Sequence, residues 1–245
     1  MIALGKPTVV FLLNGGMVAV DELVNQSNVA LVEAFYPGME GAQALAESLF
    51  GQANKWGKMP YTIYPASWAS RNSMLEHDLV SSHRTYRYGA EAVVPFGAGI
   101  SLTRFTLSAA TPTPTFQAVT GSHQVMEAEI TVQNVGELPG DEVVMAYLHP
   151  KNVSLLTYPV KTLFDFQRLN HLVPGESRNA TFRFEAGSFL LPDQDGNLLS
   201  VPGDYWLSFE NGAGQVVQTG LKINGEATVV EPFPSPKRPE SAIKL

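Results

Sequence analysis

The sequence contains no cysteine, and this absence removes several kinds of chemistry. Without thiols the chain forms no disulfide bond, no thiolate zinc site and no cysteine nucleophile. Positive charge is also scarce, with 16 Lys and Arg against 23 Asp and Glu and a formal net charge of -7. Because nucleic-acid binding needs a basic face that displaces counterions, this balance argues against a nucleic-acid partner. No histidine spacing is typical of metal ligands, and we expect neither a metal site nor a cofactor.

Long hydrophobic runs are absent as well. The longest apolar stretch, residues 8–13, is far too short to span a bilayer, and no basic segment with a small-residue cleavage site opens the chain. We therefore expect no membrane partner and no export signal in this chain. Three N-glycosylation patterns begin at Asn25, Asn152 and Asn179, where chance gives about one. They hint that a full-length protein follows an extracellular or secretory route, and the localisation of this chain stays open.

The length of 245 residues accommodates two domains, and residues 1–110 have the pattern of a partial α/β domain. Residues 8–13 form an unbroken, partly β-branched run, as in a strand of a parallel sheet that is buried on both faces. A helical stripe with a glycine after it predicts one helix, and the stripe consists of Ala42, Leu45, Ala46, Leu49 and Phe50. We also predict a short helix over 29–35 and a second strand over 59–64.

Residues 65–87 have no periodicity, which predicts a long surface connector. From there on, apolar and polar residues alternate with a period of two around 128–132 and 180–185, as in half-buried strands. Turn clusters separate further runs over 142–148, 204–209 and 215–223. About seven short strands fit residues 111–225 as an immunoglobulin or fibronectin type III-like β-sandwich. Residues 226–245 are rich in proline and predict a flexible tail.

Carboxylates and a glycine turn are the first candidates for chemistry. Asn14-Gly15-Gly16 follows a predicted buried strand, where a sugar or phosphate could bind, but the turn lacks the nucleotide-binding glycine patterns and we favour a plain tight turn. Glu33, Glu40 and Glu47 are seven residues apart and would align on one continuous helix. Pro37-Gly38 interrupts that helix, so we favour a structural role for Glu40 at a helix start and a solvent-facing Glu47.

Two histidine pairs and an aromatic cluster complete the candidates. His77-Asp78 and His83-Arg84 could form a proton relay or half of a metal site, but we favour exposed loop histidines. Tyr86, Tyr88 and Phe96 could stack against a sugar, and interdomain packing is the interpretation that we favour. No serine has the context of a nucleophile elbow.

Several segments in order resemble the C-terminal half of family 3 glycoside hydrolases, the β-glucosidase and β-xylosidase group. In the first domain they are Lys6-Pro7-Thr8-Val9-Val10 with Asn14-Gly15-Gly16, Ala34-Phe35-Tyr36-Pro37-Gly38-Met39-Glu40-Gly41, Gly57-Lys58-Met59-Pro60, Arg84-Thr85-Tyr86-Arg87-Tyr88 and Pro95-Phe96-Gly97-Ala98-Gly99. In the second they are Thr131-Val132-Gln133-Asn134-Val135-Gly136, Gly140-Asp141-Glu142-Val143-Val144, Leu163-Phe164-Asp165-Phe166, Val173-Pro174-Gly175-Glu176 and Pro202-Gly203-Asp204-Tyr205, similar to the family's fibronectin type III-like module. Ala42, Ala98 and Leu102 depart from the family pattern and leave the tightness of the interdomain junction open.

The resemblance implies a fold and a function. The fold is a partial α/β/α sandwich followed by an all-β sandwich, and the function is hydrolysis of O-glycosyl bonds in a β-xyloside or β-glucoside. In this family a (β/α)8 barrel supplies an Asp nucleophile, and a stretch upstream of the Lys-Pro strand supplies a Glu acid/base. Only residues 1–5 precede that strand here, and a barrel needs about 250 residues. We therefore expect no catalytic residue in this chain, unknown substrate-binding residues and no activity of the chain alone.

Two alternatives stay open at this point. The chain could be a non-catalytic carbohydrate-binding or protein-interaction module that uses the sandwich and the aromatic junction. It could also combine with a barrel on a separate chain, which would require an exposed apolar face on the α/β layer.

Overall fold

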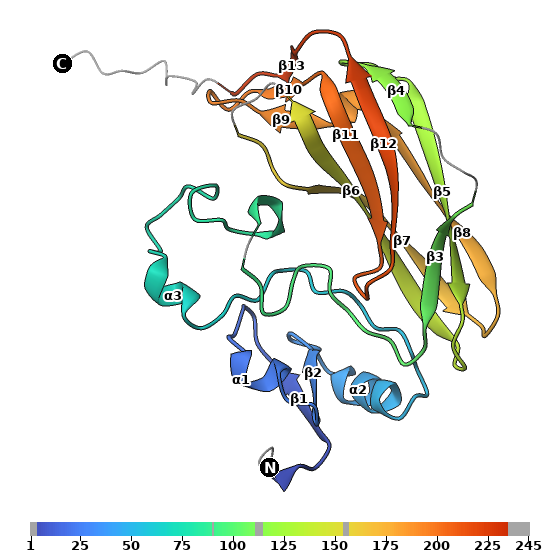
Figure 1. Ribbon diagram of the computed structural model, residues 1–245. Helices are drawn as coiled ribbons and strands as arrows, with labels where there is room; N and C mark the ends of the chain where they lie inside the picture. Colours follow the sequence, from blue (N-terminus) through green and yellow to red (C-terminus); the bar gives the residue numbers. More distant parts are fainter. Residues whose placement is uncertain (1–3, 90, 111–114, 154–156, 235–245) are drawn as a thin grey trace.

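The chain folds into a small parallel α/β layer, an irregular connector and a β-sandwich, in that order (Figure 1). The computed structural model describes residues 4–89, 91–110, 115–153 and 157–234. Strands predominate, as the sandwich takes up more than half of the described chain. Among the described helices, none has the length and hydrophobicity required to cross a membrane.

The α/β layer consists of two parallel strands joined by a short helical turn. β1 (Thr8–Leu12) confirms the first predicted strand, and it pairs in register with β2 (Val29–Glu33) across α1 (Asp21–Val24). The helix predicted over 29–35 is therefore wrong. The segment is short and rich in β-branched Val29 and Val32, and pairing with β1 satisfies its backbone groups more completely than one isolated helical turn would.

α2 (Gly41–Leu49) confirms the second predicted helix, and Gly51 follows it at a φ of +73°. Its apolar stripe is not buried as an amphipathic pattern predicts. Leu49 is 40% exposed and Phe50 is 82% exposed. The helix thus turns part of its hydrophobic face outward.

The strand predicted over 59–64 is wrong. Only Ile63 pairs, in a single antiparallel bridge to Val94, while Pro60 and Pro65 on either side have no N–H to donate. The connector that follows is irregular, as predicted, apart from α3 (Trp68–Arg71) and the 3-10 turn η2 (Tyr86–Tyr88).

Two sheets pack face to face in the sandwich. The larger has the order β4-β12-β11-β6-β7 and the smaller the order β3-β5-β8. The larger sheet comprises β4 (Phe116–Val119), β6 (Gly140–Val153), β7 (Thr162–Leu172), β11 (Gly203–Glu210) and β12 (Val216–Asn224), and the smaller comprises β3 (Phe105–Ala109), β5 (Val125–Asn134) and β8 (Ser177–Glu185). β5, β6, β8, β11 and β12 confirm the predicted strands, whereas β7 was not predicted because Asp165, Gln167 and Arg168 interrupt its apolar pattern.

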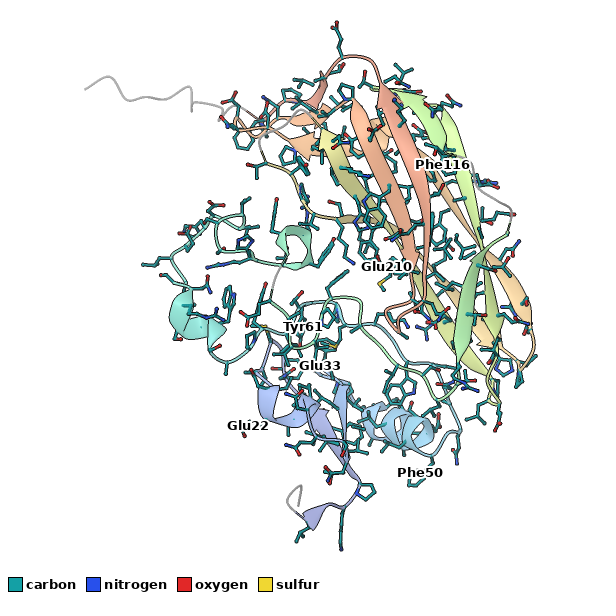
Figure 2. All side chains as sticks on the ribbon, in the orientation of Figure 1. Glu22, Glu33, Phe50, Tyr61, Phe116 and Glu210 are labelled. Atoms are coloured by element: carbon teal, nitrogen blue, oxygen red, sulfur yellow. The ribbon has the colours of Figure 1, made fainter. Side chains whose placement is uncertain are left out.

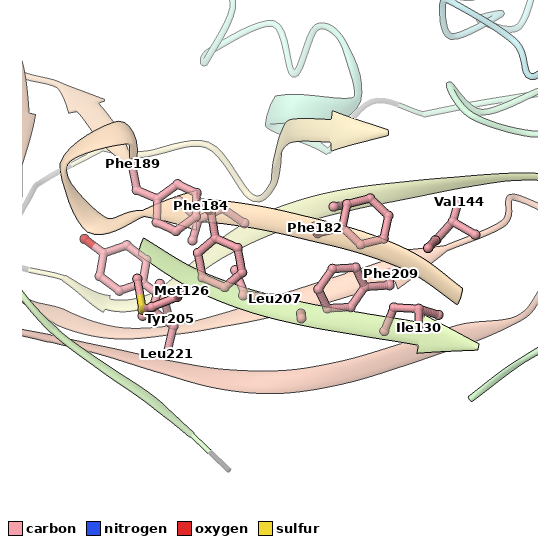
Figure 3. Close-up of a cluster of buried hydrophobic side chains, with 14 of the residues drawn as sticks. Met126, Ile130, Val144, Phe182, Phe184, Phe189, Tyr205, Leu207, Phe209 and Leu221 are labelled. Atoms are coloured by element: carbon pink, nitrogen blue, oxygen red, sulfur yellow. The ribbon is translucent and has the colours of Figure 1, made fainter. Parts of the chain in front are cut away.

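The core lies between these sheets, where aromatic rings from both interdigitate (Figure 3). Phe182 of β8 and Phe209 of β11 are fully buried, and their ring centroids are 5.0 Å apart. Burial of a ring this size stabilises the fold by about 2 to 3 kcal/mol. This core holds the two sheets of the sandwich together.

A third, small sheet covers one end of the sandwich. It contains the strands β9 (Leu190–Pro192), β10 (Leu198–Ser200) and β13 (Thr228–Glu231), and the 3-10 turn η3 (Ala186–Ser188) precedes β9 in the chain. β13 lies inside the predicted tail, so the first part of that segment is a strand, and residues 235–245 lie outside the described residues. β3 likewise joins the sandwich from before residue 111. The domain boundaries themselves stay a prediction.

Candidate functional site

The carboxyl edge of the two parallel strands collects polar groups. Asn14 follows β1, and its side-chain N and O atoms are buried with no hydrogen-bond partner in the described structure. Gly15 lies under the ring of Tyr36, since a Cβ there would be 2.7 Å from Tyr36 Cε2. The turn predicted at Asn14-Gly15-Gly16 thus lies beside Tyr36, whose exposed ring would have to move aside for a side chain at position 15.

Glu33 ends β2 at the same edge and faces Tyr61 (Figure 2). The Tyr61 hydroxyl donates to Glu33 Oε2 at 2.8 Å, and the N–H of Phe35 donates to Glu33 Oε1 at 3.1 Å. Burial, together with the hydrogen bond to this carboxylate, raises the pKa of Tyr61 to about 12. Phe35 has a φ of +52°, which is uncommon for a bulky residue and indicates local strain.

The other two glutamates do not join this edge. Glu40 is the residue before α2 and makes no side-chain cap, and Glu47 accepts a hydrogen bond from Gln43 Nε2 at 2.8 Å on the helix surface. Because Glu33 lies on a strand, the three glutamates do not align on a helix. They form no carboxylate pair of the kind that cleaves a glycosidic bond.

The connector histidines are exposed. His77 makes no contact that suggests a site, and His83 Nδ1 lies 3.1 Å from the carbonyl oxygen of Tyr88. Asp78 accepts from the N–H of Val80 at 2.9 Å, which lowers the pKa of this carboxyl. In the part of the chain that the structure describes, no three His, Asp or Glu side chains are grouped as metal ligands would be.

The aromatic junction packs the two domains together. Tyr86 stacks on Phe96 with ring centroids 4.2 Å apart, and both rest on the buried Tyr147 of β6. The Tyr86 hydroxyl accepts a hydrogen bond from the N–H of Leu163 at 3.2 Å. The packing interpretation holds for these two rings, whereas Tyr88 points to a different surface, described below.

Buried ion pairs reinforce the junction. Lys58 Nζ lies 2.7 Å from Glu142 Oε1, with side-chain exposures of 10% and 3%. Arg168 donates to Asp141 Oδ2 at 2.8 Å and to the carbonyl oxygen of Lys55 at 2.9 Å. Sequence analysis missed these pairs, although two adjacent acids at the start of a buried strand were a usable signal, since such charges need partners.

A second buried network crosses the outer face of the larger sheet. His149 lies 2.8 Å from the Ser208 hydroxyl, which donates to Glu210 Oε1 at 2.6 Å, and Lys161 Nζ lies 3.0 Å from Glu210 Oε2. Burial lowers the pKa of His149 to about 4, so its ring is neutral near pH 7. Ser208 bridges an acid and a neutral histidine, and the order of groups is not that of a nucleophilic triad.

Three carboxyl groups of the described residues have pKa values shifted away from those of a general acid. Glu176 and Asp193, like Asp78, have lowered pKa values, because the N–H of Val173 donates to the first and the amide of Asn197 to the second. A glycosidase acid needs the opposite shift. Glu142, Asp141 and Glu210 are each paired with a cation.

Known proteins match the whole of this architecture. Residues 1–102 match the glycosyl hydrolase family 3 C-terminal domain, and residues 142–212 match the fibronectin type III-like domain. The chain belongs to glycosyl hydrolase family 3. The probable exo-1,4-beta-xylosidase bxlB of Aspergillus fumigatus is 31% identical over 252 residues, which cover 96% of the family 3 chain and 33% of the relative. The exo-1,4-beta-xylosidase bxlB of Emericella nidulans is 29% identical, over 94% of this chain and 32% of its own.

Solved structures agree with this assignment. A GH3 exo-beta-xylosidase, XlnD, in complex with a xylobiose aziridine activity based probe superposes with a TM-score of 0.85 at 30% identity, covering 96% of this chain and 33% of XlnD. The beta-glucosidase from Listeria innocua in complex with glucose has a TM-score of 0.71 at 24% identity, and the match covers 92% of this chain and 32% of the glucosidase. At this identity the likeness shows the fold alone. The family 3 chain thus spans about a third of the length of the relatives it matches.

The junction of the family 3 chain is tight despite its departures from the family pattern. The N–H of Met59 donates to the carbonyl oxygen of Ala98, and the N–H of Gly97 donates to that of Met59, both at 2.8 Å. The N–H of Leu102 donates to Asn54 Oδ1 at 3.1 Å. Main-chain hydrogen bonds therefore close the junction without the tyrosines that the family commonly has there.

Proposed function

We propose that this chain is the C-terminal portion of a retaining β-glycosidase that hydrolyses O-glycosyl bonds, with β-xylosides as its preferred substrates. The observation that carries the proposal is the match to XlnD, which extends through both domains at a TM-score of 0.85 and 30% identity. The names of the relatives reported above, exo-1,4-beta-xylosidases, support xylosides rather than glucosides as the substrates.

The catalytic carboxylates lie, in this proposal, in the part of the relatives that the chain does not match. A retaining mechanism holds two carboxyl groups about 5 Å apart across the bond. Glu33 is engaged by Tyr61, and Glu142 by Lys58, so neither is free to act as nucleophile or acid/base. A (β/α)8 barrel is the proposed partner that completes the active site.

The exposed apolar surface of the first domain supports a partner of this kind. Leu13 is 62% exposed, Met39 is 94% exposed and Phe50 is 82% exposed, all around the two-stranded β1–β2 sheet. A sheet of two strands is marginal by itself, and large apolar patches mark interfaces. We infer that the residues before β3 are part of an α/β/α sandwich and that the strands from β3 onward belong to the fibronectin type III-like module.

A chimera tests the proposed function. This chain replaces the matching third of XlnD, and the purified chimera is assayed with p-nitrophenyl β-xyloside and β-glucoside. We expect turnover with preference for the xyloside, and we expect no turnover by the chain alone. A folded chimera with no glycosidase activity, or full activity of the isolated chain, would contradict the proposal.

A further inference from the structure

A groove of about 830 Å³ runs between the connector and the sandwich, away from the β1–β2 edge. Its size is within the range of small-molecule sites. Two tyrosines, two prolines and three aspartates line it, among them Tyr88, Tyr158, Pro192, Asp193 and Asp195, together with Gln194. Both domains therefore contribute to one concave surface.

Hydrogen bonds hold the walls of the groove in place. The N–H of Val160 donates to the carbonyl oxygen of Arg87 at 2.6 Å, which ties the connector wall to the sandwich wall. The Tyr158 hydroxyl donates to the carbonyl oxygen of Lys151 at 3.3 Å. Thr85, just before η2, has a φ of 64° and a ψ of 166°, a region nearly restricted to glycine. Its N–H donates to the Tyr64 hydroxyl at 2.7 Å, so neighbouring groups hold this strained residue and present Tyr88 to the groove.

The charges of the lining exclude several ligand classes. Three of the described lining residues are aspartates and none is basic, so phosphates and acidic sugars are repelled. Asp193 is ionised and fixed, because Asn197 Nδ2 donates to its Oδ2 at 2.8 Å and the N–H of Asp195 donates to its Oδ1 at 2.9 Å. The described carboxylates are also not grouped as metal ligands.

The remaining chemistry fits a neutral, polyhydroxylated ligand. The Tyr88 ring and Pro192 offer apolar faces for the C–H face of a pyranose. The carboxylates can accept hydrogen bonds from sugar hydroxyl groups, and the Gln194 amide can both accept and donate them. We propose that this groove binds a neutral β-linked oligosaccharide, the ligand class that follows from the proposed function. The groove thereby gives the fibronectin type III-like module and the connector a shared role in holding substrate.

Calorimetric titration of the intact chain with xylotriose and cellotriose tests this site. We expect at least one of the two to bind, and the stronger of them identifies the source of the ligand. Tyr88→Ala removes a ring, and Asp195→Asn removes an exposed carboxylate whose side chain is not part of the turn's hydrogen bonds. Each is expected to weaken binding about fivefold or more, as lost stacking or hydrogen bonds do.

Matched variants elsewhere serve as controls. Phe166→Ala removes an aromatic ring that is 60% exposed on β7, and Glu137→Gln removes an exposed carboxylate, and neither is expected to change the affinity. Trigalacturonic acid is expected to bind at least tenfold more weakly than the neutral trisaccharides. If neither neutral sugar binds, or if Asp195→Asn and Tyr88→Ala bind as the parent does, the proposal fails. Should Tyr88→Ala not fold, Asp195→Asn decides alone, and neither result depends on the hydrolysis assay of the chimera.

Discussion

At the level of single side chains, one buried ion pair, Lys58 with Glu142, links the two domains. Glu142 is 3% exposed, and besides Lys58 it accepts hydrogen bonds from the N–H of Val143 and from the Asn211 amide. Surface pairs in the same chain, such as Arg183 with Glu127, are 74% and 43% exposed. Burial should therefore separate the two pairs in their effect on stability.

Lys58→Met is expected to reduce the free energy of unfolding by about 3 kcal/mol, because it leaves the Glu142 carboxylate buried without its cation. Arg183→Met, the matched control, is expected to cost less than about 1 kcal/mol. Chemical denaturation of both variants measures the difference. Equal costs would show that the buried pair contributes no more than an exposed one.

His149 gives the molecule a pH dependence of known sign. Its pKa falls from 6.5 to about 4 in the fold, chiefly through burial, so the unfolded chain takes up a proton before the folded one does. This contribution to stability is present above pH 6.5 and is lost as pH falls toward 4, at about 1.4 kcal/mol per pH unit.

His149→Gln keeps a donor for Ser208 and removes the titration. The parent is expected to lose about 3 kcal/mol more than this variant when denaturation is repeated between pH 7 and pH 4. Parallel stability curves for the two proteins over that interval would show that folding does not lower the pKa of His149.

At the level of elements, the hairpin between β11 and β12 meets the junction main chain to main chain. A Cβ on Gly212 would lie 1.8 Å from the carbonyl oxygen of Gly97, whereas one on Gly214 would have nothing within 4 Å. Both glycines have positive φ, at +67° and +95°.

Gly212→Ala and Gly214→Ala therefore form a matched pair that separates the clash from the backbone conformation. Gly214→Ala is expected to cost about 1 kcal/mol, the ordinary penalty for a left-handed residue. Gly212→Ala is expected to cost about 3 kcal/mol or more, because the junction has to open. Thermal unfolding measures the stability of both variants. Similar melting temperatures would mean that the hairpin is not in tight contact with the main chain at Gly97.

Sequence patterns predicted strands with a clear alternating or continuous apolar pattern and missed elements that tertiary contacts define. β5 and β8 alternate cleanly, because one face meets the core and the other meets water. β2 was predicted as a helix, although Val29 and Val32 favour a strand, because its pairing with β1 is not visible in the sequence. The groove was unpredictable, since Tyr88 and Asp195 are over a hundred residues apart in the sequence and lack a joint motif.

At the level of the whole molecule, stability is unevenly distributed. The sandwich buries a continuous aromatic core, whereas the α/β layer has two strands and exposed apolar side chains. Amides of Ala146 and Leu207 in the sandwich are expected to exchange with deuterium at least about 100-fold more slowly than those of Val10 and Phe11 in β1. Mass spectrometry of peptic fragments measures this contrast. Uniform protection of both regions would show instead that the chain unfolds as one cooperative unit.

The near contact of Gly212 with Gly97 also bears on how such modules can be exchanged among relatives. At this contact, polypeptide backbone helps to set the angle between the sandwich and its neighbour, alongside the ion pairs and stacked rings of the junction. A sandwich transplanted from another hydrolase therefore has to be exchanged together with the segment around Gly97 that its β11–β12 hairpin contacts.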